Sequence, residues 1–285
     1  EDGHGRNIAI GWQALKDLDA GTDAYNVAIG HDAGKFVSTG IRNTIIGGLA
    51  GVALTTGQFN VALGFNSLSS EDDHGRNTAI GTNTLQAQNA GADAYNVAVG
   101  YDAGFSISTG TNNTIIGSLA GDALTTGSNN VALGYAALST DVLGSDNVAI
   151  GLQAMSATDN ARANIAIGFN TLQSLNYASL TYSHNIAIGF DTGKAMTTGT
   201  LNTLVGGLSG DALTEGNSNT AVGYQSLTSE TKGDRNVAIG FGTLSQQNNT
   251  SSTDAYNVAV GYNAGTNVTT GVSNTFLGAQ AGDAI

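Results

Sequence analysis

The chain alternates polar and apolar positions in one short pattern that recurs sixteen times. Each copy reads Asn, a β-branched residue, usually Ala, an aliphatic residue and Gly. An apolar period of two, built from β-branched residues and Gly, favours a short β-strand over a helix. The copies begin at Asn7, Asn26, Asn43, Asn60, Asn77, Asn96, Asn113, Asn130, Asn147, Asn164, Asn185, Asn202, Asn219, Asn236, Asn257 and Asn274.

The copies follow one another at a nearly fixed distance. The spacing is 17 residues in eleven of the fifteen intervals and 19, 19, 21 and 21 residues in the others. Such a period is typical of a solenoid, in which each repeat contacts only its neighbours. We therefore predict an all-β, parallel β-solenoid (a β-roll) of about 16 coils, or rungs, over residues 1–285. We expect one continuous array, and, because it starts and stops within a repeat, a segment of a longer chain.

The rung at Asn130 illustrates the two faces of each predicted strand. Val131 and Leu133 share an aliphatic face, whereas Asn130, Ala132 and Gly134 share the other. A face of Ala and Gly repeated along the array is flat and narrow. We expect that face to pack closely against other chains around an axis.

The rest of the rung is expected to contain a second strand and a main turn. In the Asn130 rung the second strand would cover residues 135–138. The main turn reads T-T-G or S-T-G, and we expect its Gly to supply a positive φ. The repeated Asn would form a structural ladder, either by stacking side-chain amides between rungs or by binding the turn backbone.

All four long intervals contain an insert, at residues 16–25, 86–95, 173–184 and 245–256. Insertions in solenoids lie on one face, which is often the binding face. The alternative is that they are tolerated surface bulges. The candidate binding residues of these loops are Asp19, Thr22, Asp23, Tyr25, Asn89, Asp93, Tyr95, Tyr177, Tyr182, Asn249, Asp254 and Tyr256.

Composition and motifs restrict the function further. A net charge of −13 argues against nucleic-acid binding, and no run of 18 apolar residues could span a membrane. The chain has no Cys, and we find no recurring catalytic, cofactor or metal motif. Asp23, Asp93 and Asp254 lack the spacing of calcium-binding β-rolls. We expect no enzyme activity, no cofactor and no metal, and, if the chain is secreted, a glycan on Asn249.

The repeats resemble those of two groups of fibrous proteins. N-V-A-I-G at Asn26, Asn147 and Asn236 is similar to the head repeats of trimeric autotransporter adhesins, although those have a shorter period. N-V-A-L-G-Y-A-A-L-S-T at Asn130 is similar to repeats of phage-type tail fibres and bacterial surface fibres. The resemblance covers essentially the whole chain. It implies a left-handed β-roll in which three chains pack side by side.

The resemblance also implies a function. We expect an extracellular fibre segment, on a cell surface or a virion, that acts as a stiff shaft or head. It would self-associate as a homotrimer or filament and display its loops to a cell-surface glycan or receptor. The alternative is an ice-binding or other lattice-matching solenoid that uses the Thr rows of the T-T-G turns. A polysaccharide-cleaving β-helix would need clustered acids or bases, which the sequence does not show.

Overall fold

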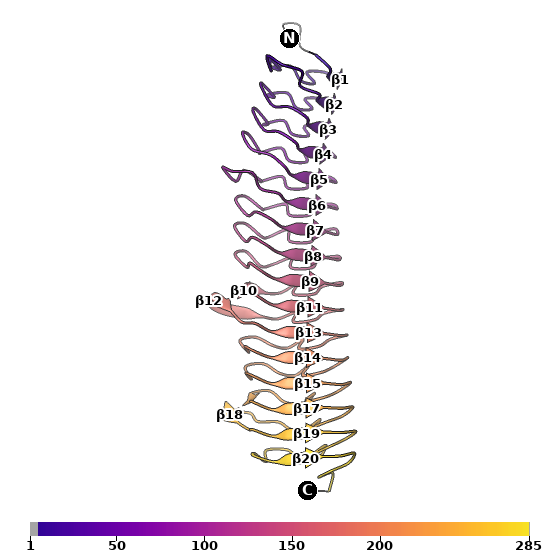
Figure 1. The fold of residues 1–285 in the computed structure, drawn as a ribbon, viewed down its shortest axis with the longest axis vertical. Helices are drawn as coiled ribbons and strands as arrows, with labels where there is room; N and C mark the ends of the chain where they lie inside the picture. The colour runs from indigo at the N-terminus through magenta and orange to yellow at the C-terminus, as the bar shows by residue number, and fades with distance from the viewer. Residues whose placement is uncertain (1–4, 285) are drawn as a thin grey trace. The chain divides into compact units, whose positions relative to one another are not determined.

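The computed structural model describes residues 5–284 (Figure 1). These residues form strands and turns and no helix, and so include no helix that could cross a membrane. The chain divides into two compact units, Glu1–Ser145 and Asp146–Ile285, and each is a parallel β-solenoid. The predicted fold class and the period of about 17 residues are confirmed.

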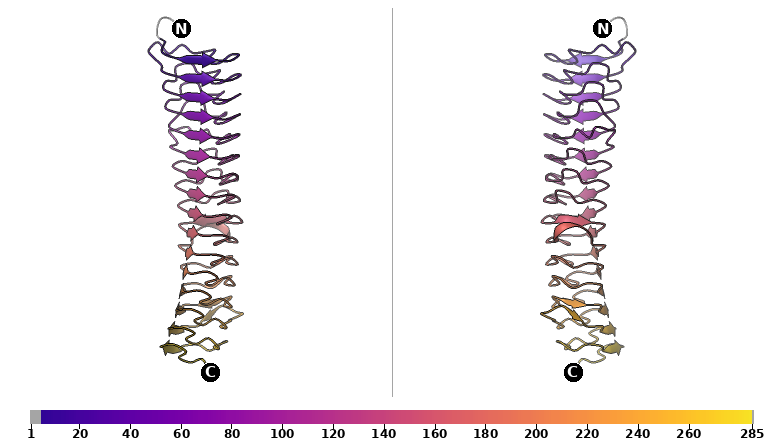
Figure 2. Two further views of the ribbon diagram at one scale, coloured as in Figure 1. Left: turned by 90° about the vertical axis from the view of Figure 1, so that its right-hand side faces the viewer. Right: turned by 90° about the vertical axis from the view of Figure 1, so that its left-hand side faces the viewer.

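The first unit stacks eight three-residue strands, one from each rung, into a parallel sheet (Figure 2). Equivalent residues pair without a shift: Val27 pairs with Thr44, and Thr78 pairs with Val97 across a 19-residue interval. The inserts therefore leave the register unchanged. The strands are β1 (Ile8–Ile10), β2 (Val27–Ile29), β3 (Thr44–Ile46), β4 (Val61–Leu63), β5 (Thr78–Ile80), β6 (Val97–Val99), β7 (Thr114–Ile116) and β8 (Val131–Leu133).

The second unit repeats this arrangement and adds two small parallel sheets. β10 (Asp159–Arg162) pairs with β12 (Asn176–Tyr182), and β16 (Gly233–Asp234) pairs with β18 (Thr253–Asp254). β12 and β18 belong to the inserts and lie to the left of the main strands in Figure 1. The main strands are β9 (Val148–Ile150), β11 (Ile165–Ile167), β13 (Ile186–Ile188), β14 (Thr203–Val205), β15 (Thr220–Val222), β17 (Val237–Ile239), β19 (Val258–Val260) and β20 (Thr275–Leu277).

The small-residue face of each strand points into the coil. Ala28, Ala98 and Ala132 are 0% exposed, whereas Leu133, on the other face, is 42% exposed. The expectation that the Ala and Gly face packs against other chains is therefore wrong. A 17-residue coil is narrow, so the space between a strand and the opposite turn admits small side chains at most strand positions.

Larger core residues occur where a neighbouring position is Gly. Ile45 replaces Ala in the middle of β3 and is fully buried. A Cβ on Gly34 would lie 2.8 Å from Ile45 Cδ1, and one on Gly51 would lie 3.5 Å from the same atom. In the next rung Ala62 returns and Leu68 fills the core. Large and small residues thus alternate so that the core stays filled.

The second strand predicted in each rung is absent from the Asn130 rung. Residues 135–138 form turns, with φ of 51° at Ala136 and 54° at Leu138. The short coil closes through alternating left-handed residues instead of a second straight segment. Each such residue costs roughly 1–2 kcal/mol, which burial of the Leu138 side chain helps to offset.

The glycine of the main turn has no side chain and so lets the backbones of successive rungs approach closely. Gly40 and Gly57 are not among the positive-φ residues, so the predicted conformation is wrong there. A Cβ on Gly40 would lie 2.5 Å from the carbonyl oxygen of Gly57. The left-handed region is used instead by the Gly that ends each strand, as at Gly47 with φ of 134°.

Candidate functional site

The repeated Asn residues lie in a column of hydrogen bonds within each unit. The backbone N–H of Asn113 donates to Asn96 Oδ1 (2.8 Å), and its Nδ2 donates to the carbonyl of Gly127 (3.0 Å). Its Oδ1 accepts the backbone N–H of Asn130 (2.9 Å). One side chain therefore stacks on its neighbours and also binds the turn backbone. Because Asn113 is buried and its amide is used in this way, it is not available to a ligand.

Three of the inserts end in D-A-Y and hold an Arg of the preceding rung. Asp23 accepts from Arg6 Nε at 3.3 Å, and the guanidinium of Arg6 lies 5.5 Å from the ring centroid of Tyr25. The same contacts join Arg76 to Asp93 and Tyr95, and Arg235 to Asp254 and Tyr256. These six candidate residues thus clamp adjacent rungs together.

The clamps are expected to stabilise the fold only weakly. Arg235 and Asp254 are each about half-exposed, and exposed ion pairs contribute about 0.2–1 kcal/mol. A double-mutant cycle of Arg235→Gln and Asp254→Asn should therefore give a coupling energy below about 1 kcal/mol, measured by chemical unfolding. A coupling above about 2 kcal/mol would mean that the clamp is a main source of stability.

Two other candidate residues are buried. Tyr177 donates its hydroxyl to the carbonyl of Gly199 (2.7 Å), and burial raises the pKa of its phenol. Asn249 is 5% exposed, and its Nδ2 donates to Glu230 Oε2 (2.9 Å). Asn249 is therefore not the glycan acceptor expected from the sequence, because its amide nitrogen points into the protein. The inserts contribute to the core as well as to the surface.

Eight candidate residues remain accessible on the inserts. Besides the clamp residues Tyr25, Tyr95, Asp254 and Tyr256, the exposed ones are Asp19, Thr22, Asn89 and Tyr182. Tyr182 belongs to β12, which stands out from the second unit on the side away from the main strands (Figure 1). These eight residues are the part of the predicted binding set that a partner could reach.

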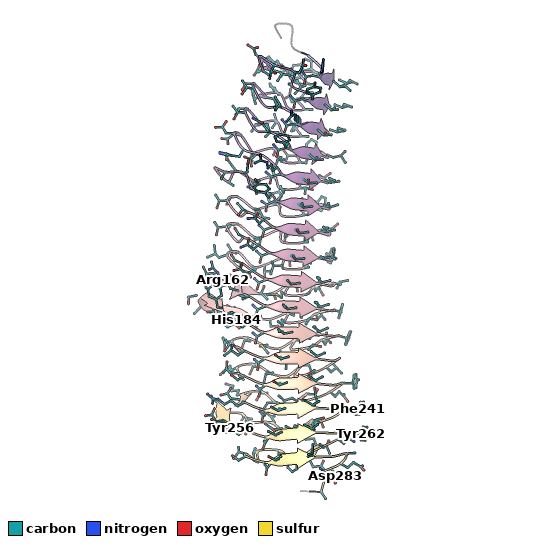
Figure 3. The ribbon with its side chains drawn as sticks, in the orientation of Figure 1. Arg162, His184, Phe241, Tyr256, Tyr262 and Asp283 are labelled. Carbon is teal, nitrogen blue, oxygen red and sulfur yellow. The ribbon has the colours of Figure 1, made fainter. Side chains whose placement is uncertain are left out.

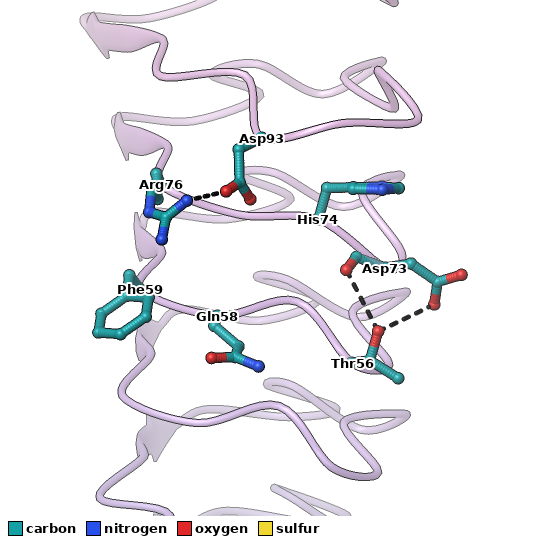
Figure 4. Close-up of a pocket in the computed structure, with 7 residues that line it drawn as sticks. All are labelled: Thr56, Gln58, Phe59, Asp73, His74, Arg76 and Asp93. Atoms are coloured by element: carbon teal, nitrogen blue, oxygen red, sulfur yellow. Dashed lines mark hydrogen bonds and ion pairs between the residues drawn. The ribbon is translucent and has the colours of Figure 1, made fainter.

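A cavity of about 260 Å³ lies beside the inserts of the first unit (Figure 4). Arg76 forms an ion pair with Asp93, and Thr56 donates to the carbonyl of Asp73 at 3.2 Å. Arg76 and Asp93 therefore neutralise each other in the wall, whereas Asp73 is held by Thr hydroxyl groups. It is lined by Thr56, Gln58, Phe59, Asp73, His74, Arg76 and Asp93.

The outward side of the main strands is uncharged and mostly aliphatic, with Thr at the first position of six strands. We call the first and last residues of each main strand the outer sheet face. Ile10, Leu63 and Leu133 of this face are 59%, 40% and 42% exposed. No main strand described between residues 5 and 284 has a charged residue at either position. A contiguous exposed apolar surface is a candidate interaction site.

An aromatic column borders the outer sheet face, at the residue after the Gly that ends each strand. Phe169 and Phe190 stack at 5.4 Å, as do Phe241 and Tyr262. Figure 3 places Phe241 and Tyr262 on the side of the second unit opposite Tyr256. The members are Trp12, His31, Phe65, Tyr101, Tyr135, Phe169, Phe190, Tyr224, Phe241 and Tyr262.

This column was not predicted from the sequence. The signal was present, since an aromatic residue or His follows the strand-ending Gly in ten of the sixteen rungs.

Comparison with known proteins leaves the family open. No family model matches the chain. A search of curated proteins gives no match either. The function must therefore be argued from the repeats and the surfaces that they form.

Proposed function

We propose that this chain is a structural segment of an extracellular fibre, a stiff shaft or head without enzyme activity. It self-associates through the outer sheet face and presents its inserts to a cell-surface glycan or receptor. The observation that carries this proposal is the outer sheet face, which is uncharged in every described rung and exposed or half-buried at each of its positions. The sequence resemblance to trimeric adhesin heads and tail fibres supports the same assignment.

The outer sheet face is suited to contact with further copies of the chain. Two β-branched or aliphatic columns run along it, and the acidic residues behind the net charge of −13 lie elsewhere on each rung. Copies that approach through this face can bury apolar area without burying charge. Parallel copies share one repeat, so matching rungs meet at every step of about 4.8 Å.

The inserts remain free when the outer sheet face is covered. In the second unit β12 and β18 lie away from the main strands, and Tyr256 lies on the side opposite Phe241 and Tyr262 (Figure 3). Tyr182 on β12 is 57% exposed. This separation supports a division between an assembly face and a display face.

The Thr rows give less support to the lattice-matching alternative. In the first unit, S-T or T-T pairs occur in two successive rungs and then give way to Asp72-Asp73 or Val142-Leu143. The hydroxyl of Thr125 donates to the backbone of the next rung, at Val142 O (2.9 Å). Broken rows with engaged hydroxyl groups do not form the flat, regular array that matching an ice lattice requires.

Self-association is tested by placing charges on the outer sheet face. We expect Leu63→Lys/Leu133→Lys to weaken assembly at least about 100-fold, because burying an unpaired ammonium costs several kcal/mol. Sedimentation velocity should show the wild type at a whole-number multiple of the chain mass and the variant as a single chain. Circular dichroism should be unchanged, since both side chains point outward.

The matched control places the same charges on the main turns. Thr109→Lys/Thr126→Lys changes two exposed residues of the T-T-G and S-T-G rows and should leave assembly intact. A wild-type chain that stays monomeric at millimolar concentration would refute the proposal. Equal loss of assembly in both variants would show that net charge, and not this face, controls association.

A further inference from the structure

One core position, six residues before the ladder Asn, carries a carboxylate in three rungs. Glu71, Asp141 and Glu230 occupy it, and all three are 0% exposed. A buried carboxylate is costly unless donors or a cation compensate its charge. Other rungs place an apolar residue there: Val37, Leu54, Ile107, Leu124, Met196 and Leu213.

The turn at Glu230 compensates its carboxylate completely with protein donors. Oε1 accepts four backbone N–H groups and Oε2 accepts two side-chain amides, at 2.8 to 3.1 Å. Glu230 is therefore a structural group that organises its own turn. The backbone donors are Thr231, Lys232, Gly233 and Asn249, and the side-chain donors are Gln247 and Asn249.

In the turn at Glu71, the carboxylate has fewer hydrogen-bond donors than in the turn at Glu230. Among residues 5–284, Glu71 Oε1 has no hydrogen-bond partner, and Oε2 accepts a long bond from Asn77 Nδ2 (3.4 Å). Gln88, which corresponds to Gln247, does not donate to Glu71, because its Nε2 is also unpartnered. Burial raises the pKa of the Glu71 carboxyl to about 7, although nearby N–H groups of His74 and Asp72 oppose this.

Two further metal-ligating side chains lie beside Glu71. One ligand atom from each of Glu71, Asp72 and His74 lies within 4.8 Å of the other two, and no other described group of three does so. His74 Nδ1 is buried and has no partner among the described residues. At the corresponding positions the Glu230 turn has Thr231 and Gly233, which offer neither a carboxylate nor an imidazole.

We propose that Glu71, Asp72 and His74 bind a divalent transition-metal ion of the Zn²⁺ class. Two carboxylate oxygens and one imidazole nitrogen form a ligand set that such ions accept, with a remaining position for water. Calcium is a poorer fit because it takes six to eight oxygen ligands. The ion would balance the negative charge of the buried Glu71 carboxylate, as backbone N–H and side-chain amide groups do for Glu230.

The three ligand atoms would have to move closer together to bind an ion. Tetrahedral ligands at about 2.0–2.2 Å from a shared ion lie about 3.3–3.6 Å apart, whereas these atoms now lie within 4.8 Å of one another. His74 also lines the cavity in Figure 4, which gives the ion a route from solvent. Bound metal would fix the turn that connects β4 to β5.

The test is a titration of the full chain with ZnCl₂ in an isothermal calorimeter. We expect one ion per chain with micromolar or tighter affinity, and a higher melting temperature when zinc is present. Asp72→Thr/His74→Gly gives this turn the residues of the Glu230 turn, so it should fold normally and bind zinc at least about 100-fold more weakly. Glu71→Gln should weaken binding as well.

Glu230→Gln is the matched control, since it changes the equivalent carboxylate without touching the proposed site. Its zinc affinity should equal that of the wild type. The proposal is overturned if the wild type takes up no zinc, or if Asp72→Thr/His74→Gly binds zinc as the wild type does. Equal weakening by Glu230→Gln and Glu71→Gln would also overturn it, because buried carboxylates would then act only through the fold.

Discussion

Asn113→Ala is expected to open the first unit locally around β7 and β8. The substitution removes the acceptor of the Asn130 N–H and the donor to the Gly127 carbonyl, both in a buried region. Each buried group left unpaired costs about 1–3 kcal/mol, so we expect a loss of about 3–5 kcal/mol. Hydrogen exchange should show loss of protection at the amide of Asn130, and thermal unfolding should begin at a lower temperature.

The neighbouring Asn112 provides the control. It is exposed, and its side chain donates only to Thr111 Oγ1 (3.2 Å). Asn112→Asp keeps a residue that tolerates the left-handed backbone at this position, where φ is 58°. Its stability should change by less than about 0.5 kcal/mol. Similar losses for the two variants would mean that the ladder is not what holds the rungs in register.

Gly47→Ala should destabilise the same unit even more. A Cβ there would lie 2.4 Å from the carbonyl oxygen of Gly64 and 2.6 Å from its carbon, and φ is 134°. Neither backbone atom can move without breaking the bond from the Gly64 N–H to the Ile46 carbonyl (2.7 Å). We expect a loss of more than about 4 kcal/mol, measured by chemical unfolding with circular dichroism.

Gly48→Ala tests whether the loss of stability is specific to position 47. A Cβ on Gly48 meets nothing closer than Phe65 Cδ2 at 3.4 Å, and the backbone is not left-handed. Stability should stay within about 0.5 kcal/mol of the wild type. If Gly47→Ala proved as mild as Gly48→Ala, the rungs would have to be less tightly stacked than the structure indicates.

The two faces of the strand explain why this fold can serve assembly. Ala132 and its equivalents fill a narrow interior, which leaves the larger aliphatic residues on the outside. An ordinary globular domain would bury such residues. Here a row of them remains exposed on each unit, and this row is the reason for proposing self-association through the outer sheet face.

The sequence revealed some roles of the inserts and concealed others. The D-A-Y motifs were visible, but their Arg partners lie 17 to 19 residues earlier and become neighbours only when the rungs stack. The burial of Tyr177 and Asn249 could not be inferred from loop composition either. The sequence does not distinguish Glu71, Asp72 and His74 from an exposed acidic loop, because the burial of Glu71 depends on the stacked rungs.

The sequence by itself determined the parallel solenoid, the number of rungs and the pairing of equivalent residues. A repeat of fixed length with Asn at one position allows one register, because any shift would break the Asn hydrogen bonds. Alternation defines two strand faces without saying which is inside. Only the tertiary structure decided which face is buried, because the width of the closed coil determines which side chains fit inside. It also decided which residues of successive rungs contact one another, because those contacts form only when the rungs stack.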